Sequence, residues 1–196
     1  MSEDYYKIYN YRGCPAENAG HSIKEGYEFF FKSEKSNLKY CIEAIYHEGD
    51  FFAIKYYCKN HRDSKRKYSI STNTHEPYKI IRSCIQIMPI LQKKYPTASF
   101  VAVGARSIFG DIIENTQNTI RFRLYYKMVY QMFSQYEDFI LMQLPEVSGI
   151  GIVFVNDIYS DPQKNLSPTK YIVERVRKIK KIVQESYDDI HIQDEE

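Results

Sequence analysis

The chain has 196 residues, with 27 Lys and Arg against 25 Asp and Glu, and 43% of its residues are hydrophobic. This length suits one domain that buries a core without disulfide or metal support. The nearly balanced charge excludes a strong overall field for nucleic acid, so any such affinity has to come from local patches.

The first part of the sequence predicts strands. Runs rich in aromatic and β-branched residues, separated by Gly, Asn, Asp and Ser, occupy 5–11, 27–33, 38–48, 51–60 and 67–73. Along 38–48 the apolar residues stand at alternate positions, which is typical of a strand with one covered side. The short connections between these runs predict antiparallel neighbours and therefore a meander.

After Pro77 the apolar residues take helical spacing up to residue 95. Pro89 lies inside this run, where it lacks a backbone donor and clashes with the preceding turn, so we expect a kink or an end near Met88. An apolar strand is predicted over 99–103. The polar stretch 105–117 follows, and connections of this length inside a compact domain are more often functional than not.

The remainder of the chain predicts a helix over 119–133 and two strands over 139–144 and 148–155. The pair Ser167-Pro168 then gives a strong start for a last helix, because a cap is followed by a proline in the first turn. Its apolar stripe predicts one buried face, with basic residues along the other.

Together these elements predict a single α+β domain over residues 1–187. The N-terminal half is expected to form an antiparallel β-meander, extended by a strand-helix-strand-strand unit, with three main helices packed on the sheet. The segment 188–196 is expected to be an acidic mobile tail.

The sequence also indicates where the protein resides. It does not open with a basic start before an apolar run, and no segment reaches the about 20 apolar residues that span a bilayer. The four cysteines are widely spaced without a C-x-x-C pair, which fits reduced thiols. We expect a cytoplasmic protein that does not enter a membrane.

One stretch points to chemistry rather than packing. The stretch from Asn118 to Lys127 is typical of a helix start, with a cap followed by two arginines in the first turn. Free amides at a helix start and guanidinium groups both bind anions. A third arginine lies in the loop before the helix, and a lysine lies one turn into it. The predicted anion or nucleic-acid site consists of Arg106, Arg121, Arg123 and Lys127. The alternative is that each arginine pairs with a carboxylate and only fixes the loop, through Asp111, Glu114 or Glu146.

Two further basic stretches occupy 59–67 and 170–181. Both are also explained as solvated faces, which is the commoner role of such runs. If they take part in binding, they would add weaker contacts to a nucleic-acid backbone. The residues expected to do so are Arg62, Lys65, Arg66, Arg177 and Lys181.

A Tyr-Pro pair at 95–96, a strand ending at Gly104 and the run Arg-Phe-Arg-Leu-Tyr at 121–125 lead into an apolar helix. This pattern resembles an uncharacterised family of small bacterial α+β proteins with a compact Gly-Ser-Thr-x-x-Arg-x-Arg-Leu-Tyr core. The chain departs from that core in having Ala-Arg after the glycine and an insertion over 107–118. The family's function is unknown, so the resemblance implies a fold and no activity.

Familiar catalytic patterns are missing from the sequence. There is no G-x-x-x-x-G-K-[ST], H-E-x-x-H, G-x-S-x-G or G-x-G-x-x-G run. Cys58-x-x-His61 has the spacing of metal ligands, but a zinc site needs a second pair, so no metal and no cofactor are predicted.

The leading interpretation is a cytosolic bacterial accessory protein that binds a phosphate-bearing partner, RNA or DNA, at the basic helix start. The alternative is a non-enzymatic protein-interaction module, such as a partner of a toxin or defence effector, which would expose a contiguous aromatic patch. A third is an acetyltransferase-like enzyme, although the Arg/Gln-x-x-Gly-x-Gly/Ala run that binds a pyrophosphate in those enzymes is missing. Aromatic-rich sheet edges favour a homodimer.

Overall fold

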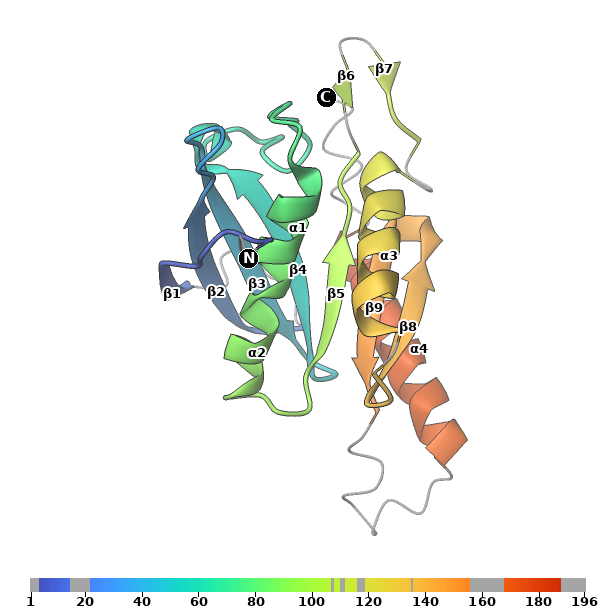
Figure 1. Cartoon of the computed structure of the whole chain (residues 1–196). Helices are drawn as coiled ribbons and strands as arrows, with labels where there is room; N and C mark the ends of the chain where they lie inside the picture. The colour runs from blue at the N-terminus through green and yellow to red at the C-terminus, as the bar shows by residue number, and fades with distance from the viewer. Residues whose placement is uncertain are drawn as a thin grey trace.

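A computed structural model describes residues 4–14, 22–106, 108–109, 112–115, 119–134, 136–155 and 168–187. A seven-stranded sheet with the strand order β1-β2-β3-β4-β5-β9-β8 forms its centre, and helices cover both faces (Figure 1). The predicted α+β class is confirmed. The acidic tail 188–196 and the predicted cap at residue 167 lie outside the described residues.

Four antiparallel strands form the N-terminal half, and three of them lie where the sequence predicts strands, whereas the strand expected over 5–11 begins only at Asn10. They are β1 (Asn10–Cys14), β2 (Ile23–Lys32), β3 (Lys39–His47) and β4 (Phe51–Cys58). The β3–β4 connection is a tight turn in which Gly49 and Asp50 both take positive φ. Glycine adopts this conformation without steric cost, which explains its place in the turn.

The expected strand over 67–73 is wrong, because this stretch forms turns and coil after the short 3-10 helix η1 (Lys59–His61). Its hydroxyl groups bind the local backbone instead of leaving it to a neighbouring strand. The Ser64 hydroxyl accepts from the Arg66 amide at 3.1 Å, and the Ser71 hydroxyl accepts from the Asn73 amide at 3.4 Å. Such local bonds compete with a strand ladder.

The helical run after Pro77 is split as predicted. It forms α1 (Pro77–Ile85) and α2 (Ile87–Gln92), which meet at Gln86, one turn before Pro89. The proline ring clashes with the carbonyl four residues earlier, which is where α1 stops. These helices then lead into β5 (Ser99–Val103), which runs parallel to β4 over the pairs from Phe51↔Ser99 to Ile54↔Ala102.

The C-terminal half extends the sheet beyond β5. A small hairpin, β6 (Ile108–Phe109) and β7 (Ile112–Ile113), precedes α3 (Ile120–Phe133). The strands β8 (Phe139–Leu144) and β9 (Gly149–Phe154) follow, joined by the 3-10 turn η2 (Pro145–Val147). The last helix is α4 (Pro168–Tyr187).

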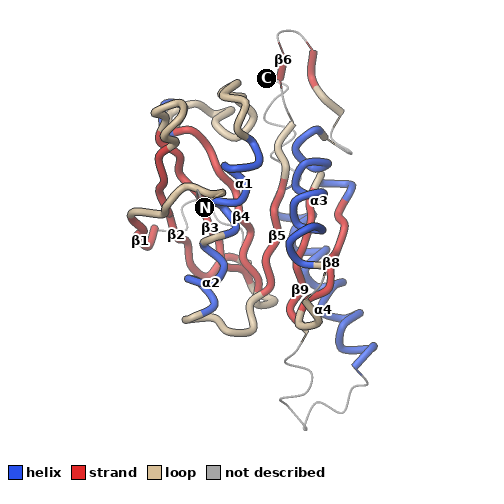
Figure 2. The backbone as a smooth tube through the Cα atoms, in the orientation of Figure 1, coloured by secondary structure: helices blue, strands red, loops and turns tan. Residues whose placement is uncertain are grey.

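Helices lie on both faces of the sheet (Figure 2). Buried apolar side chains form two large clusters, one on each face, and a third, smaller cluster at Phe30, Cys41 and Tyr57. Helices α1, α2 and α3 cover the front face, where large apolar side chains such as Phe52, Phe100 and Met128 are buried. Helix α4 covers the back face of β4, β5, β8 and β9, where Phe51 and Val101 are fully buried. The burial of two separate apolar layers supplies most of the stabilisation.

Helix α4 is held to the back face at two points. About two turns into the helix, Arg175 donates to the carboxylate of Asp50 at 3.1 Å and to the carbonyl of Thr97 at 2.6 Å. At its end, the hydroxyl of Tyr187 lies 2.6 Å from Nε2 of His47, while Nδ1 of His47 lies 3.2 Å from the Ser22 hydroxyl. A guanidinium that bridges a carboxylate and a carbonyl fixes the helix more strictly than apolar contact alone.

His47 predicts an acid-sensitive stability. Burial, reinforced by the nearby positive charge of Lys55, lowers the pKa of His47 from 6.5 to about 4. The unfolded chain therefore takes up a proton below pH 6.5 that the folded protein refuses, so stability falls as the pH drops from 6.5 towards 4. We expect a loss of about 3 kcal/mol over this range.

Urea unfolding at a series of pH values measures this loss. The variant His47→Gln should be less stable at pH 7 but should lose less stability between pH 6.5 and 4. The variant His61→Gln, altered in the loop after β4, should keep the wild-type profile. Equal pH dependence in the wild type and in His47→Gln would contradict the assignment.

Gly104 predicts a second, steric sensitivity. A Cβ atom there would lie 3.1 Å from the carbonyl oxygen of Ser148 and 3.3 Å from the backbone nitrogen of Phe122. Both neighbours are backbone atoms, so α3 would have to shift away from β5. We expect Gly104→Ala to lower the free energy of unfolding by about 1–3 kcal/mol, whereas Gly13→Ala, with nothing within 4 Å, should stay close to wild type. Thermal unfolding of both variants gives the comparison.

Candidate functional site

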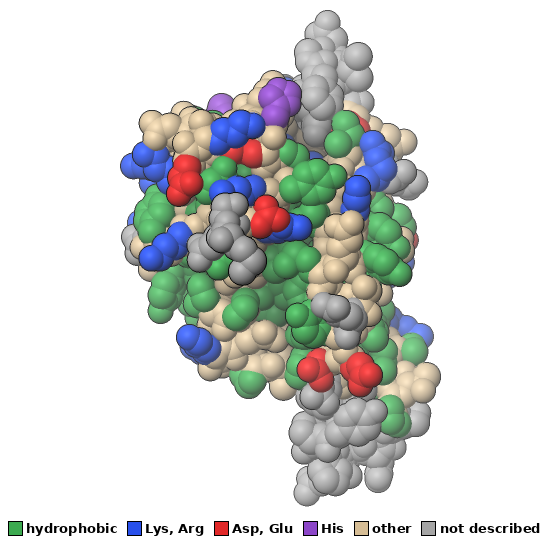
Figure 3. Space-filling view, viewed as in Figure 1, with side chains coloured by type: hydrophobic (Ala, Val, Ile, Leu, Met, Phe, Trp, Pro, Cys, Tyr) green, Lys and Arg blue, Asp and Glu red, His purple; other side chains and the backbone are tan. Residues whose placement is uncertain are grey.

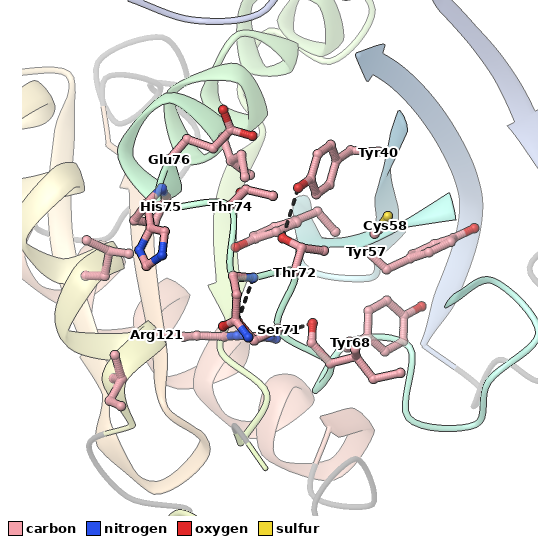
Figure 4. Close-up of a pocket in the computed structure, with 17 residues that line it drawn as sticks. Tyr40, Tyr57, Cys58, Tyr68, Ser71, Thr72, Thr74, His75, Glu76 and Arg121 are labelled. Atoms are coloured by element: carbon pink, nitrogen blue, oxygen red, sulfur yellow. Dashed lines mark hydrogen bonds between the residues drawn. The ribbon is translucent and has the colours of Figure 1, made fainter. Parts of the chain in front are cut away.

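A cavity of about 260 Å³ with polar and apolar lining residues opens beyond the carboxyl end of β4. Four segments enclose it: the start of β3, the end of β4, the loop 68–76 with the start of α1, and the first turn of α3 (Figure 4). Clefts at the carboxyl ends of parallel strands are frequent ligand sites. We call it the Arg121 cavity, and its lining includes Tyr40, Tyr56, Cys58, Thr72, Asn73, His75, Glu76, Ile120, Arg121 and Leu124.

Arg121 supplies the positive charge of this cavity. It lies in the first turn of α3, and Figure 4 shows its side chain extending towards the loop that carries Ser71. Its Nη2 donates to the carbonyl oxygens of Ser69 at 3.2 Å and Ile70 at 3.3 Å. The side chain is half-buried, and its position is therefore fixed by the loop that it faces.

The charge of Arg121 is not neutralised by a carboxylate among the residues that the structure describes. Within the same part of the chain, the N–H groups on Nε and Nη1 have no protein acceptor. A half-buried guanidinium bonded only to neutral carbonyls retains its full charge and a strong attraction for an anion. This is the clearest electrostatic feature of the cavity.

Two tyrosine hydroxyls lie close to this charge. Burial raises the pKa of Tyr56 and of Tyr125, and the positive charge of Arg121 opposes that rise in both. The two hydroxyls also interact with each other. Both side chains are therefore protonated at neutral pH, and each is a neutral hydrogen-bonding group beside the guanidinium.

The loop that faces Arg121 holds an unusual backbone. Asn73 and His75 have φ values of 49° and 54°. Asparagine tolerates this left-handed region, whereas a histidine there costs about 1–3 kcal/mol. The loop is secured by the Thr72 hydroxyl, which lies 3.0 Å from the Tyr40 hydroxyl (Figure 4). Strain of this kind is held at binding sites more often than elsewhere.

Glu76 provides a negative charge on the opposite side of the cavity from Arg121 (Figure 4). Its carboxylate accepts hydrogen bonds from the hydroxyls of Tyr6 at 2.6 Å, Ser33 at 2.7 Å and Ser36 at 2.9 Å. Burial alone would raise the pKa of Glu76, but these donors outweigh it and the pKa lies below its ordinary value. Ser33 and Ser36 follow β2 and Glu76 precedes α1, so these hydrogen bonds hold the end of β2 to the start of α1.

The predicted cap of α3 is confirmed, but protein groups occupy the helix start. The Thr119 hydroxyl accepts from the Phe122 amide at 3.1 Å, and the Glu114 carboxylate accepts from the Ile120 amide. The backbone amide of Thr119 donates to the Ser148 hydroxyl at 3.2 Å. An anion is therefore expected to meet the side chain of Arg121 rather than these amides.

The four predicted primary residues do not line one cavity. Arg121 lines it, whereas Arg106 is buried at the end of β5, with 7% of its surface exposed. Arg123 and Lys127 are exposed on α3, and Nζ of Lys127 lies 5.8 Å from the centre of the Tyr78 ring. Of the carboxylates considered as partners, Glu146 binds Lys180 at 2.9 Å, and residue 111 lies outside the described residues.

The predicted secondary residues are exposed and belong to two separate segments. Arg62, Lys65 and Arg66 belong to the loop after β4. Arg177 and Lys181 belong to α4, which packs on the opposite face of the sheet from α3. A single strand of nucleic acid that reached Arg121 would therefore not meet the basic residues of α4 on the same face.

Sequence reasoning found Arg121 but missed the loop that it faces. The run Ser-Ile-Ser-Thr-Asn at 69–73 falls within the stretch predicted as a strand from its β-branched and aromatic residues. Its dense hydroxyl and amide side chains are equally a signal for local turns. Tyr40 and Tyr56 lie in correctly predicted strands, but their approach to the loop depends on contacts far apart in sequence.

The described residues carry some surface features relevant to the other hypotheses. Tyr9 and Tyr11, at the edge strand β1, are 53% and 59% exposed. The described part of the chain has no group of three His, Cys, Asp or Glu side chains placed to hold a metal ion. None of its helices combines the length and apolarity needed to cross a bilayer.

Comparisons with known proteins found no match. No protein-family model, no curated protein and no solved structure matches the chain. A functional hypothesis therefore has to come from the geometry of the Arg121 cavity.

Proposed function

We propose that the protein binds a phosphate-bearing partner and that Arg121 holds the phosphate at the Arg121 cavity. The observation that carries the proposal is a half-buried guanidinium that lines the Arg121 cavity without a carboxylate partner among the described residues. Arginine binds phosphate oxygens through paired N–H groups, and the groups on Nε and Nη1 are suited to this.

The cavity's other groups support a phosphate ester rather than a simple ion. Hydroxyls of Tyr40 and Thr72 line the cavity and donate or accept hydrogen bonds, as a sugar or a second phosphate oxygen would require. The volume of about 260 Å³ accommodates a small ligand or one unit of a larger one. RNA or DNA, the partner predicted from the sequence, would place a terminal phosphate here, with Arg123 and Lys127 as exposed contacts on α3.

Calorimetric titration with inorganic pyrophosphate and with a short single-stranded RNA tests the proposal. We expect Arg121→Gln to weaken the binding of both at least tenfold, because the charged donor is lost. Arg123→Gln, on the exposed side of the same helix, should leave pyrophosphate binding within about twofold of wild type. The salt dependence of RNA binding should flatten in Arg121→Gln.

The same substitution also removes the bonds to Ser69 and Ile70, so stability has to be measured alongside binding. Arg121→Lys keeps the charge and should retain part of the affinity even where its melting temperature equals that of Arg121→Gln. Equal pyrophosphate affinity of the wild type and a folded Arg121→Gln would remove the proposed site. Binding of pyrophosphate but not of RNA would leave a small ligand as the partner.

A protein-interaction module is the principal alternative, and the exposure of Tyr9 and Tyr11 favours it. Exposed tyrosines at a sheet edge offer both apolar area and backbone groups to a partner strand. In that case a toxin or defence effector, or a second copy of this chain, would bind at β1, and its binding would not depend on Arg121.

An acetyltransferase-like enzyme is the third hypothesis, and the parallel seam favours it. The pairing of β4 with β5 ends at Ile54↔Ala102, while β4 continues to Cys58, so the two strands part where the Arg121 cavity lies. One observation argues against this hypothesis. The amides of Ile120 and Phe122 at the start of α3 already donate to protein groups, so they are not free to bind a pyrophosphate.

A thermal-shift titration with acetyl-CoA separates this hypothesis from the other two. An acetyltransferase-like site predicts a saturable rise in melting temperature, of about 3 °C or more at ligand concentrations far above the dissociation constant. Coenzyme A and pyrophosphate serve as the controls. A rise no larger than that given by pyrophosphate alone would count against any acyl-carrier site.

A further inference from the structure

Strand β8 forms one edge of the seven-stranded sheet, and no strand in the described part of the chain pairs with its outer side (Figure 1). An open edge is a template for a further strand, and proteins commonly protect it with charges, proline or bulges. The run Phe-Ile-Leu-Met-Gln-Leu of β8 has neither charge nor proline, and its register with β9 is continuous from Phe139↔Phe154 to Leu144↔Gly149. The other edge strand, β1, carries the charge of Arg12. β8 is therefore the edge that is better suited to pairing with another chain.

The backbone groups that this edge offers follow from its pairing with β9. The Val155 amide donates to the Asp138 carbonyl at 2.9 Å. In an antiparallel pair, the residues whose backbone groups face the neighbouring strand alternate along the chain. The even-numbered residues of β8 therefore face β9, whereas the N–H and C=O groups of Phe139, Leu141 and Gln143 point outward.

A row of aromatic side chains flanks this edge on the front face of the sheet. The rings of Tyr126 and Tyr130 stack with centres 6.0 Å apart, and the Phe133 ring lies 5.9 Å from that of Tyr136 and 6.1 Å from that of Phe139. Positions 126, 130 and 133 share one flank of α3, and the contact of Phe133 with β8 shows that this flank faces β8. Tyr130 and Tyr136 are each 52% exposed, and hydrophobic side chains are visible along this flank (Figure 3). Contiguous exposed apolar surface of this kind marks an interaction site.

Opposite charges stand at the two ends of the aromatic row. The end of α3 contacts the start of β8, whereas Thr119 at the start of α3 bonds to Ser148 beyond the end of β8, so the helix and the strand run in opposite directions. The exposed Arg123 lies in the first turn of α3, and the exposed Glu137 and Asp138 precede β8 at the other end. Figure 3 shows basic side chains over the upper part of α3 and acidic ones below it. A second copy related by a twofold axis would bring the acidic end of each copy towards the basic end of the other.

We infer that a second copy of this chain docks at this edge, through antiparallel pairing of β8 with its counterpart about a twofold axis. With Leu141 opposite Leu141 of the second copy, Phe139 lies opposite Gln143, so each outward-facing residue meets an outward-facing residue. The strand is neutral, so no like charges oppose each other within the pair. A register that matches itself, a neutral strand and opposite charges at the two ends favour a copy of this chain as the occupant.

This surface is separate from the Arg121 cavity. The cavity includes Pro77 and Ile80 of α1, so it lies on the α1 side of α3, whereas the aromatic row lies on the β8 side. The pairing uses none of the residues that line the cavity. The dimer and the proposed phosphate site therefore stand or fall separately.

Sedimentation velocity over a range of protein concentrations tests the dimer. We expect the wild type to pass from monomer to dimer as the concentration rises. The double variant Tyr130→Ser, Tyr136→Ser removes the most exposed rings of the aromatic row and should raise the dissociation constant at least about tenfold. The double variant Tyr9→Ser, Tyr11→Ser removes two tyrosines of similar exposure at β1 and should leave it within about twofold of wild type.

Cysteine cross-linking tests the register. Directly opposite residues of an antiparallel pair have Cα atoms about 5.5 Å apart, which suits a disulfide. Under mild oxidation Leu141→Cys should give a disulfide-linked dimer, whereas Gln143→Cys, displaced along the strand from its own copy, should not exceed the wild-type background. Gln143→Pro removes an outward-facing N–H without removing a bond to β9, and it should also prevent the dimer. The tyrosine variants serve where a β8 variant does not fold.

The outcomes decide the inference without reference to phosphate binding. A wild type that stays monomeric at every concentration overturns it. Equal weakening by the two pairs of tyrosine substitutions, or weakening by the β1 pair alone, also overturns it. Cross-linking of Gln143→Cys as fast as that of Leu141→Cys overturns the twofold register. Pyrophosphate binding of the same samples reports on Arg121 alone, so a failure of either site is recognised by itself.

Discussion

The parallel pairing of β4 with β5 is the contact on which the rest of the molecule depends. It joins two antiparallel units through the four pairs from Phe51↔Ser99 to Ile54↔Ala102. Parallel strands need a crossover, and α1 and α2 supply it on the front face. Because the pairing stops before β4 ends, the carboxyl end of β4 and the loop after it enclose the Arg121 cavity with α3. The pairing of β4 with β5 therefore determines both the fold and the position of the candidate site.

The two faces of the sheet are stabilised in different ways. The back face combines apolar burial with two polar anchors of α4, Arg175 near the middle of the helix and the His47–Tyr187 contact at its end. The front face has a divided helical cover, so that it contains both a large core and an open strip at Ile54 and Ala102.

Local signals in the sequence were sufficient for most of the fold. The effect of Pro89 on the helical run and the Thr119 cap of α3 follow from chemistry within a few residues, and both were predicted. The parallel seam was not predicted, because its register depends on the packing of residues about 50 positions apart. The strand predicted over 67–73 was wrong because hydrogen bonds from hydroxyl groups to the local backbone outweighed the strand preference of its β-branched residues.

The candidate site shows the same division. Arg121 was identifiable because an arginine after a helix cap is a local pattern, whereas its carbonyl partners at 69 and 70 come from a distant loop.

The packing of α4 has a further consequence for folding during translation. Helix α4 covers Phe51, Val101 and the other apolar residues of the back face. Because residues 168–187 leave the ribosome last among these elements, the nascent chain exposes a hydrophobic, aggregation-prone sheet face until late in translation. We expect chaperones of nascent chains to bind this face before α4 covers it.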